Sequence, residues 1–242
     1  MPVPGRWWWG CSPRPARERL RIIAAMMPPM LATALLLLVA YLLGSVSGSL
    51  VLGRLRGVDI REHGSGNAGG TNALRTLGWR FALGVAAIDV AKGALAAWLA
   101  LRLAPVGQPL SVTAHGYLAA ALAIAGHVWP VWHGFRGGKG AATAVGGLLV
   151  LWPWALPLLL LAWVAVVAAT GYVGLATVVA GLTLPLQAWW SGAEPARAGF
   201  AVGVAVFLMF THRANLQRLR RGDEARFERA RLLHRLYRWG RR

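Results

Sequence analysis

The sequence predicts an all-α protein, a polytopic bundle of transmembrane helices in one domain. Hydrophobic residues make up 57 % of the 242-residue chain and charged residues 14 %, with a mean hydropathy of +0.50. An average soluble domain carries about a quarter charged residues. Several apolar runs approach the roughly 20 residues that a helix needs to cross a bilayer. Basic residues gather beside these runs, as is typical of segments that flank a membrane.

Apolar runs predict spans over about 30–52, 81–103 and 114–132, then a long apolar stretch over 144–190 and a short one over 198–210. We expect Pro153, Pro157, Gly171 and Gly174 to break the long stretch.

The positive-inside rule places the loops 54–80 and 135–143 and the basic tail after residue 211 in the cytoplasm. An even number of crossings must then lie between residues 144 and 211, either two long helices or four short ones. The total is five or seven spans. Both totals put the N-terminus outside, against its own positive charge, so its side stays open.

Three segments are expected: an extension rich in Trp and Arg over 1–29, disordered or interfacial; a transmembrane domain over 30–224; and a basic tail over 225–242. In the tail, Phe227, Ala230, Leu233 and Tyr237 follow helical spacing among arginines, which predicts a helix on the membrane surface. The single cysteine, Cys11, excludes a disulfide framework. Basic residues that flank spans also argue against nucleic-acid binding.

Three short polar stretches interrupt this apolar chain. The first, GSGNAGGTNALR, runs from Gly64 to Arg75 and has almost no apolar side chain to bury. Its glycines match GxGxxG, and Asp89 lies twenty residues beyond Gly69. A dinucleotide fingerprint must join a strand to a helix, however, and here a predicted span follows. The stretch instead suits a backbone nest that binds phosphate, with a flexible loop as the alternative.

The second stretch, FRGGKGAAT, runs from Phe135 to Thr143 and opens an apolar run. Lys139 is followed by Gly140 rather than by Ser or Thr, so the stretch is not a Walker motif. A glycine nest with a cation at a helix N-terminus still favours an anion. The alternative is a positively charged turn at the membrane interface.

The third stretch, HRANLQRLRRGDE, begins at His212. The six histidines include no HExxH pair, and the chain has no GxSxG elbow. We therefore expect no metal, no cofactor and no nucleophilic serine. Asp89 and Lys92 lie one turn apart inside a span, where they either pair structurally or line a substrate entrance.

With their flanking residues, the three stretches resemble the signature motifs of the bacterial acyl-phosphate:glycerol-3-phosphate acyltransferase family; the matching segments are GSGNAGGTNALRTLG, GHVWPVWHGFRGGKGAAT and HRANLQRLRRGDE. The segments GVDIREHGSGN and IDVAKG resemble it as well, and the likeness covers about residues 41–224. Gly70, Arg136 and Ala141 depart from the family's usual residues without removing a charged or hydroxyl group. The resemblance favours seven spans in the bacterial inner membrane, with the active site facing the cytoplasm.

The resemblance implies transfer of a fatty acyl group from acyl phosphate to the 1-hydroxyl of glycerol 3-phosphate. The products are 1-acyl-glycerol 3-phosphate (lysophosphatidic acid) and phosphate. An acyl phosphate is already activated, so no covalent enzyme intermediate is needed. The implied partners are the two substrates and membrane lipids, and the oligomeric state stays open.

Residue roles are assigned from the motif match and the chemistry of each side chain. The predicted catalytic residues are Ser65, Arg75, Lys139, His212 and Asn215. The predicted substrate-binding residues are Gly64, Gly66, Asn67, Thr71, Asn72, Gly137, Gly138, Gly140 and Thr143.

Lys139 and the nest from Gly137 to Gly140 are expected to hold the phosphate of glycerol 3-phosphate. Ser65 and Arg75 are expected to bind phosphate or to polarise the acyl carbonyl. His212 orients the acceptor hydroxyl, and either its ring or the donor's own phosphate takes the proton.

Three further neutral side chains, those of Asn67, Asn72 and Thr143, are expected to hydrogen-bond to substrate. Asn215 shares the orienting role of the preceding histidine. Glu224 is expected to be structural, paired with a nearby arginine.

A transporter or channel for an organic phosphate is the main alternative function. Such a protein favours inverted repeats, however, and none is visible in the sequence. A regulatory or scaffold protein would not need three such stretches.

Overall fold

The computed structural model describes residues 28–105 and 109–227, and these residues form helices and connecting loops. The α-helices are α2 (Pro29–Gly44), α3 (Gly48–Leu55), α4 (Gly70–Leu77), α5 (Trp79–Leu103), α6 (Val112–Val128), α7 (Ala141–Leu151), α8 (Leu156–Thr170), α9 (Val173–Trp190), α10 (Pro195–Thr211) and α11 (Arg213–Arg221). Three 3₁₀ turns, η1 (Ile60–Glu62), η2 (Val131–His133) and η3 (Pro153–Ala155), join them. The predicted all-α fold is confirmed.

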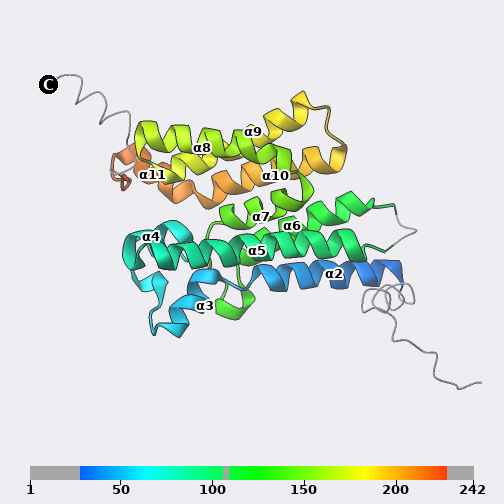
Figure 1. Ribbon diagram of the computed structural model, residues 1–242, viewed down its shortest axis with the longest axis horizontal. Helices are drawn as coiled ribbons and strands as arrows, with labels where there is room; N and C mark the ends of the chain where they lie inside the picture. The colour runs from blue at the N-terminus through cyan, green and yellow to red at the C-terminus, as the bar shows by residue number, and fades with distance from the viewer. Residues whose placement is uncertain (1–27, 106–108, 228–242) are drawn as a thin grey trace, which may run out of the picture.

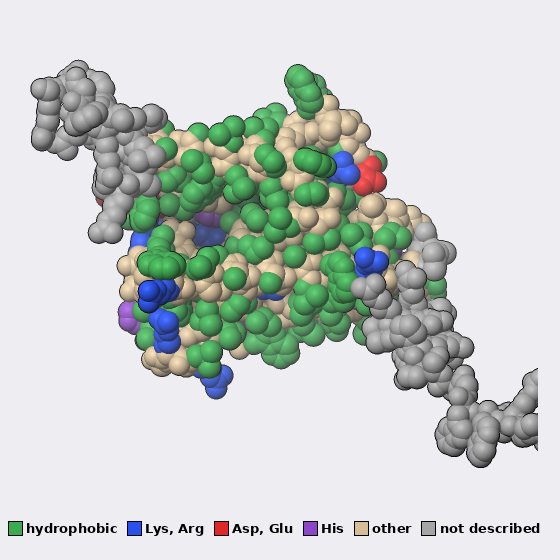
Figure 2. Space-filling view, viewed as in Figure 1, with side chains coloured by type: hydrophobic (Ala, Val, Ile, Leu, Met, Phe, Trp, Pro, Cys, Tyr) green, Lys and Arg blue, Asp and Glu red, His purple; other side chains and the backbone are tan. Residues whose placement is uncertain are grey.

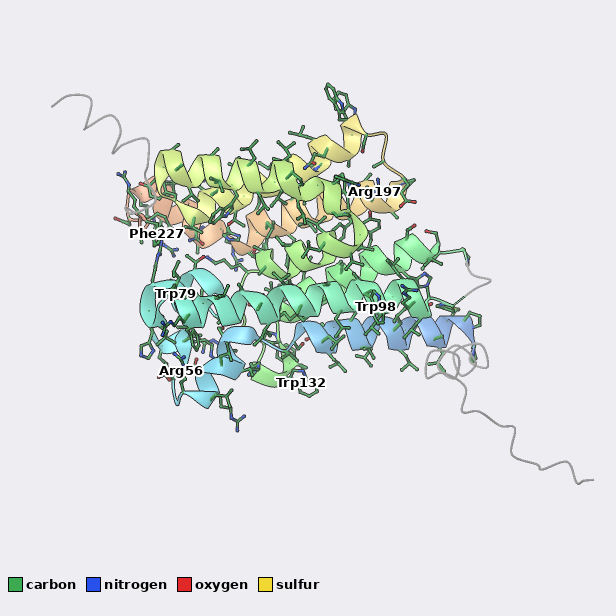
Figure 3. The ribbon with its side chains drawn as sticks, viewed as in Figure 1. Arg56, Trp79, Trp98, Trp132, Arg197 and Phe227 are labelled. Atoms are coloured by element: carbon green, nitrogen blue, oxygen red, sulfur yellow. The ribbon has the colours of Figure 1, made fainter. Side chains whose placement is uncertain are left out.

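The long helices lie side by side along one axis (Figure 1). Helices α3, α4 and α11 gather at one end of this bundle, and α7 lies in its middle, packed between α5 and α6. Figure 3 shows Arg56, Trp79 and Phe227 at the end that carries α3, α4 and α11, whereas Arg197 lies toward the other. All three polar stretches of the sequence therefore meet at one end.

The bundle exposes many large apolar side chains and buries several polar ones among its apolar core, as expected of a protein surrounded by lipid. Exposed side chains on α2, α8 and α10 include Leu38, Leu161 and Val206, and hydrophobic side chains cover the face in Figure 2. Buried polar side chains include Ser45, Ser47, Ser49, Asp89, Lys92, His115 and His127. The apolar exterior is what distinguishes this bundle from a soluble protein.

Within the described residues, three segments are long and apolar enough to cross a membrane: α5, Pro153–Thr170 and α9. The number reaches five if two bent pairs each form one span, α2 with α3 (48°) and α10 with α11 (52°). The total of five to seven spans stays a prediction.

Between residues 144 and 211 the choice between two and four crossings stays open. The chain there forms the end of α7 and all of α8, α9 and α10. Breaks occur at Pro153 and Gly171 as predicted, but the breaks predicted at Pro157 and Gly174 are wrong. Both residues lie in the first turn of a helix. Proline is tolerated there because the N–H it lacks has no intrahelical acceptor.

Two predicted segments lie largely outside the described residues. The Trp-rich extension over 1–29 contributes only Pro28 and Pro29, where α2 begins. The predicted surface helix of the tail lies beyond Phe227, the last described residue. These two predictions stay as they are.

Glycines allow α5 and α7 to approach backbone to backbone. A Cβ built on Gly93 of α5 would overlap the carbonyl oxygen of Thr143, and one on Gly146 of α7 would overlap that of Val90. This contact fixes where α7 begins, and the second polar stretch ends at that point.

We expect Gly93→Ala to destabilise the bundle by about 1–3 kcal/mol, because the added methyl group overpacks a backbone contact. The midpoint of thermal unfolding of the purified protein in detergent should fall by several degrees. Gly203→Ala in α10 is the matched control, because its Cβ would meet nothing within 4 Å. Equal midpoints for the two variants would contradict the prediction.

Candidate active site

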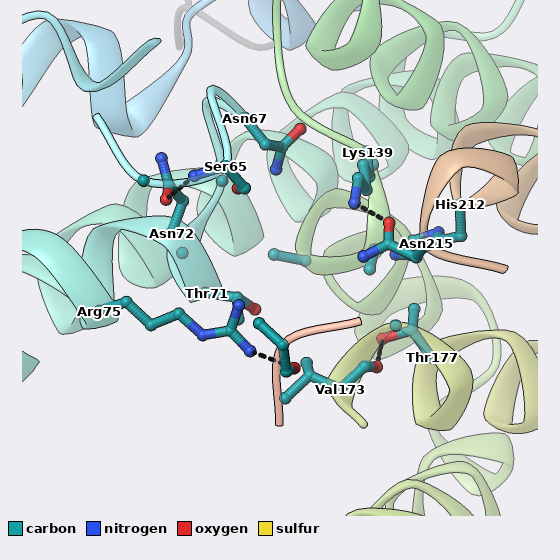
Figure 4. Close-up of a pocket in the computed structure, with 18 of the residues that line it drawn as sticks. Ser65, Asn67, Thr71, Asn72, Arg75, Lys139, Val173, Thr177, His212 and Asn215 are labelled. Carbon is teal, nitrogen blue, oxygen red and sulfur yellow. Dashed lines mark hydrogen bonds between the residues drawn. The ribbon is translucent and has the colours of Figure 1, made fainter. Parts of the chain in front are cut away.

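The polar end of the bundle encloses a cavity of about 610 Å³. That volume suits a small polar ligand or part of a larger one. Its walls come from the loop before α4, α4 itself, the start of α7, the start of α9, and the segment from His212 to Ala225. Figure 4 shows Ser65, Asn67 and Arg75 on one side, facing Lys139, His212 and Asn215 on the other.

Asn72 shapes the first wall. Its Nδ2 donates to the carbonyl oxygens of Ile60 (3.1 Å) and His63 (2.9 Å), and its Oδ1 accepts from the N–H of Ser65 (3.0 Å). The side chain is 3 % exposed, and Gly64 next to it has a φ of +58°, which glycine adopts at low cost. Asn72 therefore organises the loop that carries Ser65, and its predicted hydrogen bond to substrate stays a prediction.

Arg61 joins the loop before the first stretch to the loop before the second. Its guanidinium pairs with Asp59 (2.7 Å), and its NH1 donates to the carbonyl oxygen of His133 (3.0 Å). The side-chain hydrogen bond from Arg61 lowers the pKa of Asp59 to about 2. This pair holds the two loops together outside the cavity.

The second stretch contributes fewer backbone donors than the sequence suggests. The N–H groups of Gly137 and Gly138 donate to the carbonyl oxygens of Val128 and His127, each at 3.1 Å. Neither glycine lines the cavity. Of the three glycines in the predicted nest, only Gly140 therefore lines the cavity. Gly140 has a φ of +89° and immediately precedes α7.

Lys139 starts a chain of polar contacts. Its Nζ donates to Oδ1 of Asn215, whose Nδ2 donates to Glu224 (2.6 Å). Arg218 donates to the other oxygen of Glu224 (2.7 Å), so the predicted pairing of Glu224 with an arginine is confirmed. Burial lowers the pKa of Lys139 to about 8, with Arg218 adding to the effect and Glu224 opposing it.

The ring of His212 is held with one nitrogen turned toward the protein. Its Nδ1 lies 2.9 Å from the carbonyl oxygen of Leu208, and this oxygen can only accept, so Nδ1 carries the hydrogen. The other nitrogen, Nε2, is then an acceptor when the ring is neutral. His212 is 5 % exposed and lines the cavity, so the geometry suits a proton acceptor.

The segment after α11, Asp223–Phe227, passes over the cavity and joins its two sides. Arg75 donates to the carbonyl oxygen of Ala225 (3.2 Å), and the N–H of Phe227 donates to Gly171 (2.8 Å). Arg226 donates to the hydroxyl of Tyr172 (2.6 Å). We name Asp223–Phe227 the strap.

Three helix N-termini also face the cavity. Gly70 and Thr71 begin α4, Ala141 and Ala142 begin α7, and Val173 begins α9, and all of them line the wall. The first N–H groups of a helix have no intrahelical acceptor, and they favour an anion. With the cations of Lys139, Arg75 and Arg218, the cavity is suited to phosphate.

These features match known proteins. The family model described as glycerol-3-phosphate acyltransferase matches residues 34–222. Similar relatives named glycerol-3-phosphate acyltransferase include one from Desulforudis audaxviator, 40 % identical over 81 % of this chain and 96 % of its own. Another, from Parasynechococcus marenigrum, is 43 % identical over 85 % and 95 %. The chain belongs to the glycerol-3-phosphate acyltransferase family.

A solved structure of this acyltransferase family agrees in three dimensions. It is PlsY, an integral membrane glycerol 3-phosphate acyltransferase, in its glycerol 3-phosphate form. The TM-score is 0.74 at 32 % identity, covering 81 % of this chain and 95 % of that one. A second PlsY structure, in a lysophosphatidic acid form, gives a TM-score of 0.74 at 31 % identity, covering 84 % and 98 %. The chain is thus an integral membrane protein of this family.

The structure brings most of the predicted site of this acyltransferase together. The predicted residues that line the cavity are Gly64, Ser65, Asn67, Thr71, Asn72, Arg75, Lys139, Gly140, His212 and Asn215. Those that do not are Gly66, Gly137, Gly138 and Thr143. Thr143 is fully buried in the contact of α7 with α5, and its predicted hydrogen bond to substrate stays a prediction.

Other residues of the wall escaped the sequence analysis. Trp163 and Thr177, joined by a hydrogen bond of 3.2 Å, line the cavity from α8 and α9. They lie in continuous apolar sequence, where no motif marks them. His127 also lines the wall; it lies in the segment GHVWPVWHGFRGGKGAAT, but no role was predicted for it. Asp89 pairs with Lys92 (3.0 Å), which agrees with the expected structural pairing, and it also lines the cavity.

Proposed function

We propose that the protein transfers a fatty acyl group from acyl phosphate to the 1-hydroxyl of glycerol 3-phosphate, forming lysophosphatidic acid and inorganic phosphate. The observation that carries the proposal is a single cavity lined by a proton-accepting histidine, by cations and by helix N-termini. Both proposed substrates carry phosphate, so the cavity's main task is to hold two anions with their reacting atoms in contact. Such positioning contributes roughly 7–11 kcal/mol.

The proposed step is direct acyl transfer. The 1-hydroxyl oxygen of glycerol 3-phosphate attacks the acyl carbonyl carbon, and the bond from that carbon to the phosphate oxygen breaks. The hydroxyl proton goes to Nε2 of His212, which returns it to the departing phosphate. Lys139 and Arg75 offset the phosphate charges, and donors aimed at the carbonyl oxygen stabilise the oxyanion.

A covalent intermediate on the enzyme is unnecessary in this scheme. Among the described residues, Ser65 is the serine in the cavity wall, and its hydroxyl makes no hydrogen bond to a histidine within this part of the chain. A serine nucleophile normally needs an adjacent base. We assign Ser65 to substrate binding.

The surface around the cavity indicates how the acyl chain would reach it. Figure 2 shows a hollow with basic and histidine side chains at its floor and hydrophobic side chains around it. A lipid-like donor can enter such a hollow sideways from the bilayer, with its phosphate toward the floor. By the positive-inside rule we place this end of the bundle in the cytoplasm and the protein in the bacterial inner membrane.

The test uses purified protein in detergent or lipid with palmitoyl phosphate and labelled glycerol 3-phosphate. Labelled lysophosphatidic acid should appear together with an equal amount of phosphate, and phosphate release should require glycerol 3-phosphate. Acyl thioesters in place of acyl phosphate should give no product. Phosphate release without the acceptor, or uptake of unchanged glycerol 3-phosphate into liposomes, would contradict the proposal, and uptake would favour a transporter.

The reaction should weaken above about pH 8. Burial lowers the pKa of Lys139 to about 8, so this ammonium is charged below that pH and loses its charge above it. Attraction for phosphate then falls, and kcat/KM for glycerol 3-phosphate should fall as pH rises through the free enzyme's pKa. Lys139→Arg is the comparison, because guanidinium stays charged. An identical alkaline decline in Lys139→Arg would assign it to another group.

A further inference from the structure

His127, near the end of α6, belongs to a buried charged cluster at the cavity wall. Its Nδ1 lies 2.7 Å from Nζ of Lys92 and 3.3 Å from Oδ1 of Asp89, and the lysine and aspartate lie 3.0 Å apart. All three side chains are at most 5 % exposed. Ionisable groups at such depth are costly and are commonly tied to function.

The cluster is fixed by the break between α2 and α3. Lys92 also donates to the carbonyl oxygen of Val46 (2.8 Å), and Asp89 also accepts from the N–H of Gly48 (3.1 Å). The lysine and the aspartate, held in this way, both contact the imidazole at Nδ1. Their charges offset each other, so the cluster does not repel an anion.

These contacts determine which nitrogen of His127 carries a hydrogen. An ammonium group can only donate, so Nδ1 accepts from Lys92 when the ring is neutral. The hydrogen is then on Nε2. If the ring is protonated instead, Nε2 carries a hydrogen as well. In both states Nε2–H is a donor.

This donor lies beside the phosphate-binding residues. A Cβ built on Gly138 would overlap Nε2 of His127 and would lie 2.8 Å from the carbonyl oxygen of Ala68. Nε2 is thus next to the residue that precedes Lys139, and His127 lines the cavity together with Lys139 and Gly140. Glycine at position 138 leaves room for the ring.

We propose that His127 is a further substrate-binding residue, which donates a hydrogen bond from Nε2 to a phosphate oxygen in the cavity. Lys92 and Asp89 are positioning residues, because they hold the ring through Nδ1 without touching the ligand. The proposal rests on the proposed function in that it takes the ligand to be a phosphate substrate. The phosphate can belong to glycerol 3-phosphate or to the acyl phosphate.

Two substitutions distinguish the role of the inner nitrogen, Nδ1, which contacts Lys92, from that of the outer nitrogen, Nε2. The amide of asparagine reaches about as far as Nδ1, so His127→Asn keeps a partner for Lys92 and loses the outer donor. The amide of glutamine reaches about as far as Nε2, so His127→Gln keeps the outer donor. We expect His127→Asn to raise KM for one of the two substrates about 10- to 100-fold, as expected for one hydrogen bond to a charged group. His127→Gln should stay within about threefold, and kcat should change little in either.

Binding is also measured without turnover. Glycerol 3-phosphate and a non-transferable acyl phosphonate should each raise the thermal midpoint of the purified protein in detergent, because both bind the folded state. His127→Asn should lose the shift with one ligand and keep it with the other. The ligand whose shift is lost identifies the source of the phosphate. Lys92→Met should weaken binding of that same ligand, since the ring loses its support.

Wild-type binding shifts for both ligands in His127→Asn, with both KM values unchanged, would overturn the proposal. So would equal losses for both ligands in the asparagine and glutamine variants, because that pattern marks a structural role. Failure of the proposed function looks different. The wild-type protein would then bind glycerol 3-phosphate without producing lysophosphatidic acid, and the shift lost in His127→Asn would still support the inference.

Discussion

Lys139→Met is expected to lower kcat/KM for glycerol 3-phosphate roughly 10²- to 10³-fold, the range seen when a preorganised donor is removed from a reacting anion. Lys139 is the cation at the start of α7, and it faces the wall formed by Ser65 and Asn67 (Figure 4). Methionine preserves the length of the side chain and removes its charge. Steady-state transfer assays at several glycerol 3-phosphate concentrations measure the effect.

Arg136→Met is the matched control for this prediction. Arg136 lies in the same stretch and is exposed, but it does not line the cavity. The Arg136→Met substitution removes one positive charge from the same loop, so it lowers the general attraction of the loop for anions by the same amount as Lys139→Met. We expect a change of less than about threefold, as is usual for exposed charges. Equal losses in the two variants would mean that net charge, and not the placement of Lys139, governs binding.

His212→Gln is expected to lower kcat about 10²- to 10⁴-fold, the usual contribution of a positioned general base. KM for glycerol 3-phosphate should change little. The amide of glutamine provides hydrogen-bonding atoms of similar reach, but it does not take up a proton. The separation of kcat from KM is what distinguishes a base from a binding residue.

His133→Gln is the control for the histidine prediction, because His133 lies in η2 and does not line the cavity. Its kcat should match that of the wild-type protein. If His212→Gln instead raises KM and leaves kcat unchanged, His212 binds the acceptor, and the donor's phosphate takes the proton. Single-turnover measurements would then show an unchanged chemical step.

The sequence predicted the all-α class and the meeting of three polar stretches because each rests on local chemistry. Apolar runs must become helices in lipid, and glycine-rich stretches with cations cannot be buried in a bilayer. The breaks at Pro153 and Gly171 were predicted because proline and glycine locally interrupt helices. The breaks predicted at Pro157 and Gly174 were wrong, because the effect of these residues depends on where a helix begins, and that position is set by packing.

The sequence predicted which residues line the cavity more accurately than it predicted the contacts that each of them makes. Arg75, Lys139 and His212 line one cavity as expected. The sequence does not show that Gly137 and Gly138 use their N–H groups on α6, because those hydrogen bonds join residues through the fold. Trp163 has no sequence signal either, since an apolar helix shows its cavity-facing side chain only after it is packed.

The strap has a practical consequence for anyone who attaches a reporter to this protein. Phe227 follows the strap residue Ala225 of the cavity wall and is hydrogen-bonded to Gly171, so a fluorescent domain joined soon after it would be tethered close to the cavity. Pro28 lies at the opposite end of the bundle, where α2 begins (Figure 1). A reporter placed ahead of that residue is therefore tethered away from the cavity.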